Sequence, residues 1–349
     1  MPGSTDEALH RRLDDGRARA GSTDPEQAAL WEALAAATEG GKRFRPALVV
    51  AAHAALGGTR PAAAAEVGAA VELLHTAFVI HDDVIDGDEM RRGRLNVSGT
   101  FHAQALTDGA DPEDAAAYGR TAGILAGDLA LAAALRAVAT CGAPRDVVDR
   151  LLDRFDAALH TTAAGELADV RLSLGLGASS LEECLAMEEQ KTSAYSFSLP
   201  LQAGALLAGA DEAIVTGLGE AGRSLGIAFQ LLDDVIGVFG DPAITGKSTT
   251  ADLRARKQTP LLAHARRTSQ WEQIVGFLGR DLDDDELQQV RGLLTASGSR
   301  RFVEELAESH LLRARRTVEE AGIRAELITS LTTAAPAAAP AADASEVAA

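Results

Sequence analysis

Residues 71–86 have the sequence VELLHTAFVIHDDVID, an apolar run with helical spacing that ends in three aspartates. On a helix, Asp82 and Asp86 lie one turn apart on the same face, with Asp83 close by. Carboxylates at this spacing repel one another, and the negative end of the helix dipole adds to the repulsion. The pattern therefore predicts a bound cation. Mg²⁺ fits best, because it accepts a few carboxylates and keeps water and phosphate oxygens as its other ligands.

A second stretch later in the chain repeats this pattern. Residues 229–240, FQLLDDVIGVFG, again place two aspartates, Asp233 and Asp234, after an apolar helical run. One aspartate cluster alone can be a solvated acidic turn, but its recurrence favours a functional site. We therefore expect the two acidic helix ends to share a metal cluster.

The composition excludes several classes of protein. A net charge of -18 argues against a nucleic-acid-binding surface, which needs a basic field. Cys141 and Cys184 lie far apart without C-x-x-C spacing, so neither a disulfide framework nor a zinc site is expected. No charge-free run reaches the roughly 20 apolar residues of a membrane span, and the N-terminus resembles no secretory signal. We expect a cytoplasmic protein that is not membrane-bound.

Helical periodicity dominates the chain and β-branched alternation is absent, which predicts an all-α fold. Helix starts are predicted at Asp24, Asp111 and Ser180, where capping residues precede helical patterns, and in the acidic run 281–286. Three parts of the chain are distinguished by their composition. They are a loosely held polar arm (residues 1–22), a folded domain (residues 23–330) and a disordered Ala/Pro-rich tail (residues 331–349).

Residues 40–46, GGKRFRP, place three cations on a turn that precedes another helix. Glycines let the backbone approach a ligand, and Arg45 can bind two phosphate oxygens at once. Alone, such a cluster is more often solvated surface. In so acidic a chain, however, it indicates a local site for an anion.

These residues together resemble the trans-isoprenyl diphosphate synthase (polyprenyl synthetase) family, whose motifs recur in order from Gly40 to Lys257. The resemblance implies a single-domain helical bundle around a deep central cavity. It also implies a homodimer and about three Mg²⁺ per active site.

The second acidic motif departs from the family, because Gly237 stands where a last aspartate is usual, a variant associated with bacterial geranylgeranyl diphosphate synthases. We expect Gly237→Asp to be tolerated. The implied metal ligands are Asp82, Asp86 and Asp233, with Asp83, Asp169 and Asp234 as further candidates.

The activity that the resemblance implies is Mg²⁺-dependent head-to-tail condensation of isopentenyl diphosphate with allylic diphosphates. Each basic or polar motif then has an implied role. The diphosphate of isopentenyl diphosphate is bound by Lys42, Arg45, His75 and Arg92. The allylic diphosphate faces Arg91, its departing diphosphate is held by Lys191, and phosphate charge is neutralised by Lys247 and Lys257. The allylic cation is stabilised by Thr192 and Gln230, and Phe229 lies by the acceptor.

Product length is expected to depend on the helix that leads into the first acidic motif. Residues eight, five and four before Asp82 should line the channel for the growing chain, and they are Leu74, Ala77 and Phe78. Two adjacent aromatic residues would close the channel early, but Ala77 leaves one of those places open. This favours the twenty-carbon geranylgeranyl product over the fifteen-carbon farnesyl product.

Three other functions stay open at this point. The chain could be a farnesyl diphosphate synthase, a class I terpene cyclase, or a noncatalytic subunit that binds isoprenoid diphosphates. A cyclase holds one diphosphate, so the second basic set around Arg45 argues for condensation. The intact first acidic motif argues against a noncatalytic subunit, whereas Gly237 leaves room for one.

Overall fold

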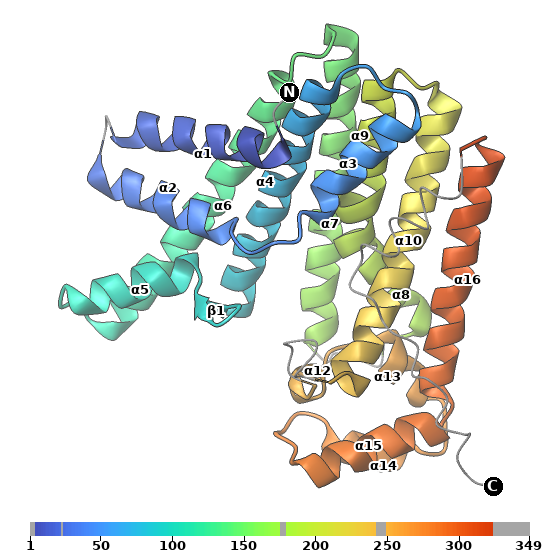
Figure 1. Ribbon diagram of the computed structural model, residues 1–349. Coiled ribbons are helices and arrows are strands. Elements are labelled where there is room, and N and C mark those ends of the chain that lie inside the picture. Colours follow the sequence, from blue (N-terminus) through green and yellow to red (C-terminus); the bar gives the residue numbers. More distant parts are fainter. Residues whose placement is uncertain (1–3, 22–23, 175–178, 242–248, 324–349) are drawn as a thin grey trace, which may run out of the picture. The chain divides into compact units, whose positions relative to one another are not determined.

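The computed structural model describes residues 4–21, 24–174, 179–241 and 249–323, and these are almost entirely helical (Figure 1). The all-α prediction is confirmed. The described residues also contain one short hairpin, in which β1 (Met90–Arg91) pairs with β2 (Arg94–Leu95). The helical elements of the described residues are α1 (Thr5–Gly21), α2 (Pro25–Ala37), α3 (Phe44–Ala55), α4 (Pro61–Asp86), α5 (Val97–Thr107), α6 (Pro112–Ala139), α7 (Arg145–Ser173), α8 (Leu181–Glu188), η1 (Glu189–Ser198), α9 (Leu199–Ala208), α10 (Glu212–Phe239), α12 (Ala251–Arg254), α13 (Pro260–Ala265), α14 (Trp271–Ile274), η2 (Val275–Phe277), α15 (Asp284–Ala296) and α16 (Ser299–Glu320).

The predicted helix starts are present, each with a capping hydrogen bond. Asp24 and Asp111 accept from the backbone N–H two residues later, and each precedes a proline in the first turn. Ser180 forms a complete capping box with Glu183. The acidic run is also a helix start, because Asp283 caps α15. These caps satisfy backbone donors that would otherwise lack partners, which fixes where each helix begins.

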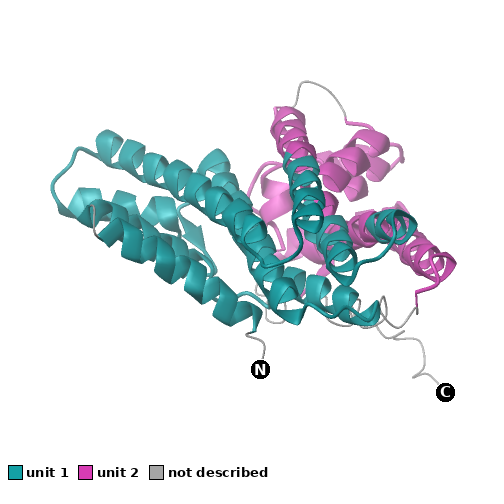
Figure 2. Cartoon of the chain, turned by 90° about the horizontal axis from the view of Figure 1, so that it is seen from above, with its two compact units in different colours: residues 1–159, 195–219 teal, residues 160–194, 220–349 magenta. Residues whose placement is uncertain are grey.

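The chain divides into two compact units, coloured separately in Figure 2. Unit 1 comprises Met1–Leu159 and Tyr195–Gly219, and unit 2 comprises His160–Ala194 and Glu220–Ala349. The first acidic motif and the GGKRFRP turn lie in unit 1. The second acidic motif and Lys191 lie in unit 2. Each unit is therefore described by itself.

The N-terminal arm corrects a prediction, because Thr5–Gly21 form a regular helix, α1, rather than a loose segment. Leu9 and Leu13, one turn apart, are buried, and α1 packs against α2 and α4. A Cβ on Gly16 would lie 2.3 Å from the ring of Trp31, so the missing side chain makes room for that ring. The sequence pattern missed the helix because α1 holds few large apolar residues and buries them against α2 and α4. The predicted tail, residues 331–349, lies outside the described residues.

Helix α4 is the central element of unit 1 and packs against α1, α3 and α6. Both α4 and α6 contain an 18-residue window apolar enough to suit a membrane span by length and composition. In α4, 78% of that window is buried inside the structure, as in the core helix of a globular unit. The apolar run before the first acidic motif is therefore explained by packing.

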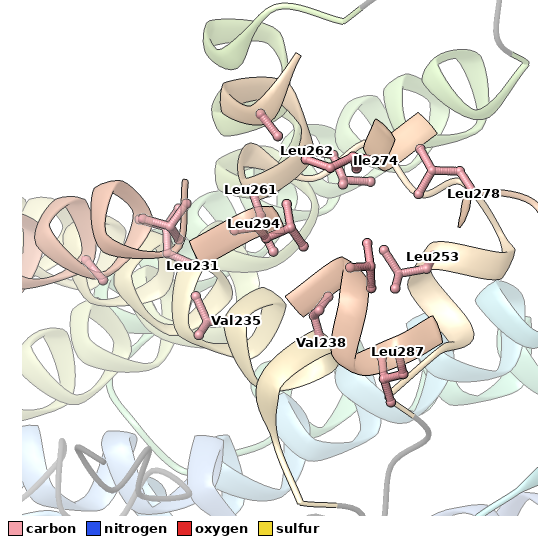
Figure 3. Close-up of a cluster of buried hydrophobic side chains, with 14 of the residues drawn as sticks. Leu231, Val235, Val238, Leu253, Leu261, Leu262, Ile274, Leu278, Leu287 and Leu294 are labelled. Atoms are coloured by element: carbon pink, nitrogen blue, oxygen red, sulfur yellow. The ribbon is translucent and has the colours of Figure 1, made fainter. Parts of the chain in front are cut away.

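The core of unit 2 is a cluster of buried aliphatic side chains contributed by several helices (Figure 3). Leu231, Val235 and Val238 of α10 meet Leu253 of α12 and Leu294 of α15 in this cluster. Burying an aliphatic side chain of this size contributes about 1.5–3 kcal/mol. The short helix α12 is thereby held against the end of α10 that carries the second acidic motif.

Candidate functional site

The first acidic motif lies at the C-terminal end of α4, as predicted. Asp86 is the last helical residue, and Gly87 ends the helix with φ 72°, a left-handed conformation that glycine adopts without strain. The three aspartates differ in exposure: the side chain of Asp82 is 27% exposed, that of Asp83 is 4% exposed, and Asp86 is largely exposed. Two carboxylates are thus accessible to a cation, and one is buried.

Arg91, on β1, contacts the buried carboxylate. Its Nε and Nη2 atoms lie 2.8 Å and 2.5 Å from Oδ1 of Asp83, and Nη2 lies 3.5 Å from Asp82. Burial raises the pKa of Asp83 despite this partner. Arg91 therefore neutralises Asp83 in this structure. The Arg91 guanidinium also lies near the carboxylate of Asp82.

The GGKRFRP turn and the turn between β1 and β2 each contain a backbone conformation that is uncommon for residues other than glycine. Arg43 and Arg92 have φ values of 51° and 52°. Such residues cost free energy and persist where the surroundings hold them. Here the holding contacts are known: the Nη1 of Arg43 donates to Thr38 O, and the Nη1 of Arg92 donates to Glu39 O. The contacts tie both loops to the end of α2, so each loop has a fixed shape.

Arg43 and Arg45, two residues apart in the turn, have different roles in the structure. Arg43 forms ion pairs with Glu72, at 2.8 Å, and with Asp6. Glu72 is only 5% exposed, so Arg43 is the charge partner of a buried carboxylate. Arg45 instead donates to neutral hydroxyls, those of Ser196 and Tyr195, at 2.9 Å and 3.5 Å. In the part of the chain that the structure describes, Arg45 thus has neutral partners, which leaves its charge suited to an anionic ligand.

Tyr195 brings three sequence-predicted residues together within unit 1. The guanidinium of Arg45 lies over its ring at 5.2 Å, its hydroxyl lies 3.3 Å from Nδ1 of His75, and the ring of Phe78 packs at 4.8 Å. Desolvation lowers the pKa of His75 well below its usual value, and the charges of Arg45 and Arg92 act in the same direction. His75 is therefore neutral near pH 7, and Arg45 carries the positive charge of this group.

In unit 2, Lys191 lies between two carboxylates of α7. Its Nζ is 3.1 Å from Glu166 and 2.6 Å from Asp169, so two sequence-predicted residues, Asp169 and Lys191, meet. Lys191 is part of η1, a π-helical stretch of ten residues, a conformation that is frequent at functional sites. Gly165 allows this approach, because a Cβ there would lie 2.2 Å from the backbone N of Lys191.

The second acidic motif is more buried than the first. Asp234 is 5% exposed, and among the described residues its Oδ2 has no hydrogen-bond partner. Burial raises the pKa of Asp234 to about 7, although a hydrogen bond with Glu188 and the charge of Lys257 oppose the shift. Burial and repulsion from Asp234 also raise the pKa of Glu188 well above its usual value. Asp233, the residue before Asp234, is half-buried.

A side chain at Gly237 would meet the carboxylate of Asp252, so the predicted tolerance of Gly237→Asp depends on that flexible side chain moving aside. A Cβ on Gly237 would lie 2.6 Å from Oδ2 of Asp252, closer than real Cβ contacts allow. The Asp252 carboxylate, from α12, already occupies the space beside Gly237. A second carboxylate there would add both overlap and repulsion.

The remaining predicted residues differ in exposure. Lys42 is exposed at the start of the basic turn, whereas Thr192, Phe229 and Gln230 are half-buried on η1 and α10. Of the proposed chain-length residues, Leu74 and Ala77 are buried on α4 and Phe78 is half-buried. Lys247 lies outside the described residues.

Sequence reasoning missed Tyr195, Glu188 and Asp252 as site residues. Tyr195 and Glu188 flank the Lys191-Thr192 pair by three or four residues, and a π-helical turn is not visible in a pattern read with α-helical spacing. Asp252 lies fifteen residues after Gly237, beyond the motif itself. The signal that could have pointed to Asp252 was the missing acid at Gly237, which indicated that another carboxylate should be sought nearby.

The acidic residues supply oxygen donors only, which is the ligand type that Mg²⁺ prefers. Within the described residues, no three His, Cys, Asp or Glu side chains form a ready metal-binding group. The buried Oδ2 of Asp234, which has no hydrogen-bond partner among the described residues, is a further oxygen of the type that Mg²⁺ binds.

Comparison with known proteins shows which family model and which relatives the chain resembles. A family model described as polyprenyl synthetase matches residues 27–294. The (2E,6E)-farnesyl diphosphate synthase of Mycobacterium tuberculosis is 36% identical over 293 residues, which cover 81% of this chain and 75% of that protein. A geranylgeranyl diphosphate synthase of the same organism is 36% identical over 258 residues, covering 73% of this chain and 68% of that protein.

A solved structure agrees over nearly the full length. The geranylgeranyl pyrophosphate synthase from Corynebacterium glutamicum, complexed with isoprenyl diphosphate and magnesium, matches with a TM-score of 0.85 at 27% identity. The match covers 95% of this chain and 96% of that chain. The similar proteins thus share a reaction type, while their names differ in product length.

Proposed function

Since the chain belongs to the polyprenyl synthetase family and is a trans-prenyltransferase, we propose that it condenses isopentenyl diphosphate with allylic diphosphates to give geranylgeranyl diphosphate. The observation that carries this proposal is the presence of two cationic groups, one in each unit. Arg45 with His75 and Tyr195 forms one group in unit 1, and Lys191 with its carboxylates forms another in unit 2. A reaction between two diphosphates needs two such groups, because only one of the diphosphates leaves.

The residues present fit magnesium. Asp82 and Asp86 on α4, and Asp233 on α10, would hold it, with Asp83, Asp169 and Asp234 as further carboxylates and about three ions in all. When bound, Mg²⁺ would spread the charge of the allylic diphosphate and make it a better leaving group. The accessible carboxylates at the end of α4 support this assignment, because Mg²⁺ prefers oxygen ligands of this kind.

The residues of the chain have distinct tasks in the proposed reaction. Arg45 would hold the diphosphate that stays, and Lys191 would stabilise charge on the diphosphate that leaves. The C–O bond of the allylic diphosphate breaks, and the double bond of isopentenyl diphosphate attacks the resulting cation. One C–C bond forms and one proton is lost, with the released diphosphate as its acceptor. Thr192 and Gln230 are placed in the proposal beside the cation.

A substrate panel tests the proposed function. The purified full chain is incubated with Mg²⁺, labelled isopentenyl diphosphate and, in turn, dimethylallyl, geranyl or farnesyl diphosphate, and product lengths are measured. We expect elongation with all three primers and accumulation of the twenty-carbon product. A fifteen-carbon end product would make the chain a farnesyl diphosphate synthase. Cyclic hydrocarbons formed without isopentenyl diphosphate, or no turnover, would contradict condensation altogether.

We also propose that the chain forms a homodimer, as the family resemblance implies. Helix α6 supports this, because only 44% of its most apolar window is buried and Ile124, Leu125 and Leu135 are exposed. Sedimentation of the purified chain should give the mass of two copies, and Leu125→Glu should shift it towards one. A wild-type chain that sediments as a monomer would exclude the dimer.

A further inference from the structure

The segment between the first acidic motif and α5 carries the hairpin of β1 and β2. Arg91 lies on β1, and Arg92, with a φ of 52°, forms the turn together with Gly93. Arg91 and Arg92 are the residues of this hairpin to which the family resemblance assigns substrate diphosphates. Where their side chains lie depends on how residues 88–96 are attached to neighbouring elements.

The backbone of this segment lies directly on the first turn of α5. Asn96, the N-cap of α5, accepts a hydrogen bond from Gly99 N at 2.8 Å, and its side-chain amide donates to Asp88 O at 2.7 Å. Asn96 N also donates to Glu89 O at 3.0 Å. A Cβ on Gly99 would lie 2.2 Å from that same backbone oxygen, so the missing side chain of Gly99 permits the close approach.

A side-chain contact extends this attachment along α5. Oε1 of Glu89 lies 2.5 Å from Nδ1 of His102, and we call this contact the Glu89–His102 clamp. An ionised carboxylate only accepts hydrogen bonds, so Nδ1 is the donor, and the bond is stronger than one between neutral groups. The His102 side chain is 21% exposed, so water screens the contact only in part. His102 is held in turn, because a Cβ on Gly119 of α6 would lie 3.0 Å from its Cβ.

The hairpin also contacts the end of α2. Arg92 Nη1 donates to Glu39 O at 2.9 Å, and Arg94 pairs with the Glu39 carboxylate at 3.2 Å. The side chains of Arg94 and Glu39 are 61% and 64% exposed, and pairs so exposed contribute little. The Glu89–His102 clamp should therefore hold the hairpin more strongly than the Arg94 pair does.

We propose that Glu89 and His102 are positioning residues, whose clamp fixes the hairpin on α5 and so holds Arg92 in place for the diphosphate of isopentenyl diphosphate. The inference rests on the proposed function, because that function gives Arg92 its ligand. Glu89 and His102 act through the hairpin rather than by touching substrate. Loss of the clamp should weaken substrate binding and leave unit 1 folded, because the Asn96 cap and the close approach at Gly99 remain.

The test compares substitutions of His102 in the full chain. His102→Leu keeps a side chain of similar size and removes the donor, whereas His102→Asn keeps a donor near the place of Nδ1. Arg94→Gln is the matched control, because it removes the exposed ion pair of the same hairpin. His102→Leu is also combined with Arg92→Asn, since asparagine tolerates the φ of 52°. The measurements are steady-state kinetics and amide hydrogen exchange of residues 88–96, the second of which needs no turnover.

We expect His102→Leu to raise the KM for isopentenyl diphosphate about three- to tenfold with little change in kcat, because it removes one hydrogen bond to a charged group. His102→Asn and Arg94→Gln should stay within about twofold of the wild type. In the Arg92→Asn background, His102→Leu should raise the KM no further, because the residue that the clamp positions is gone. Hydrogen exchange of residues 88–96 should be faster in His102→Leu than in the wild type.

An equal rise in KM with and without Arg92 would overturn the proposal, since it would show that His102 acts independently of Arg92. The same rise in Arg94→Gln, or unchanged hydrogen exchange in His102→Leu, would overturn it as well. If His102→Leu fails to fold, Glu89→Ala decides: an unchanged KM and unchanged exchange contradict the proposal. A chain that lacks condensation activity, but in which His102→Leu speeds the exchange, would refute the proposed function and leave the attachment of the hairpin by the clamp intact.

Discussion

Arg43 and Arg45 show how neighbouring residues of one motif divide between structure and ligand binding. Arg43 pairs with buried Glu72, whereas Arg45 donates to the hydroxyls of Tyr195 and Ser196. We expect Arg45→Ala to raise the KM for isopentenyl diphosphate about 10- to 100-fold with little change in kcat. It removes a charged hydrogen bond, worth about 1.5–3 kcal/mol, to a group that does not leave. Steady-state kinetics with each substrate varied in turn measures this.

Arg43→Ala is the matched control for that prediction. It leaves the Glu72 carboxylate buried without its partner, so the free energy of unfolding should fall by about 3 kcal/mol. Urea denaturation of both variants separates the two effects. If Arg43→Ala and Arg45→Ala lowered stability equally, or if Arg45→Ala changed only kcat, the division of roles would be wrong.

His75 should make the stability of unit 1 depend on pH. Desolvation and nearby arginines lower its folded-state pKa, whereas the unfolded chain binds a proton near the usual value of 6.5. Its contribution to stability is thus complete above pH 6.5 and is lost as pH falls below 6.5, by at most about 1.4 kcal/mol per pH unit. His75→Gln removes the titrating group. The free energy of unfolding of the wild type should therefore fall relative to that of this variant between pH 7 and pH 5. An equal change with pH in both proteins would contradict the lowered pKa of His75.

Among the elements, η1 depends on glycines in the helices that pack against it. A Cβ on Gly165 would overlap the backbone of Lys191, and one on Gly226 would lie 2.4 Å from the side chain of Ser193. Gly165→Ala should therefore push η1 away, lower kcat and destabilise the fold by about 1–3 kcal/mol.

Gly292→Ala is the control for that change, because a Cβ on Gly292 of α15 meets nothing within 4 Å. It should leave kcat unchanged and stabilise the protein by about 0.4–1 kcal/mol. Thermal unfolding and steady-state rates of both variants decide the matter. Full activity in Gly165→Ala would show that the close approach to Lys191 has no part in the reaction.

Helix α4 carries the residues proposed to set product length. Phe78 packs against Tyr195, and Ala77 is buried one residue earlier. Ala77→Phe should shorten the product, and Phe78→Ala should lengthen it, because each methylene that finds room contributes about 0.8 kcal/mol. Chromatography of the products from both variants measures this. Unchanged product lengths in two folded variants would show that another part of the molecule limits the chain.

At the scale of the whole molecule, the sequence predicted the fold class, the helix starts and the family. Periodicity and capping residues are local properties, so Asp111, Ser180 and Asp283 could be read directly as caps. The family resemblance, drawn from motifs between Gly40 and Lys257, is confirmed by the family model and by relatives over most of the chain.

What the sequence did not predict depends on contacts between distant residues. Helix α1 is stabilised by Trp31 and α4, so its own two leucines gave too weak a pattern. Asp252 reaches Gly237 only because Leu253 is buried against α10. Tyr195 joins Arg45 and His75 across 150 and 120 residues of sequence. Such pairings follow from packing and cannot be read from spacing.

The central claim is condensation of two diphosphates with loss of one, at a site that needs Asp82. The most direct measurement is the ratio of inorganic diphosphate released to isopentenyl diphosphate incorporated, in the wild type and in folded Asp82→Ala, with Mg²⁺ and farnesyl diphosphate. We predict a ratio of one for the wild type. We also predict a rate lower by several orders of magnitude in the variant, because it removes a carboxylate proposed to bind the cation. Diphosphate release without incorporation, or near-normal turnover in Asp82→Ala, would contradict the claim.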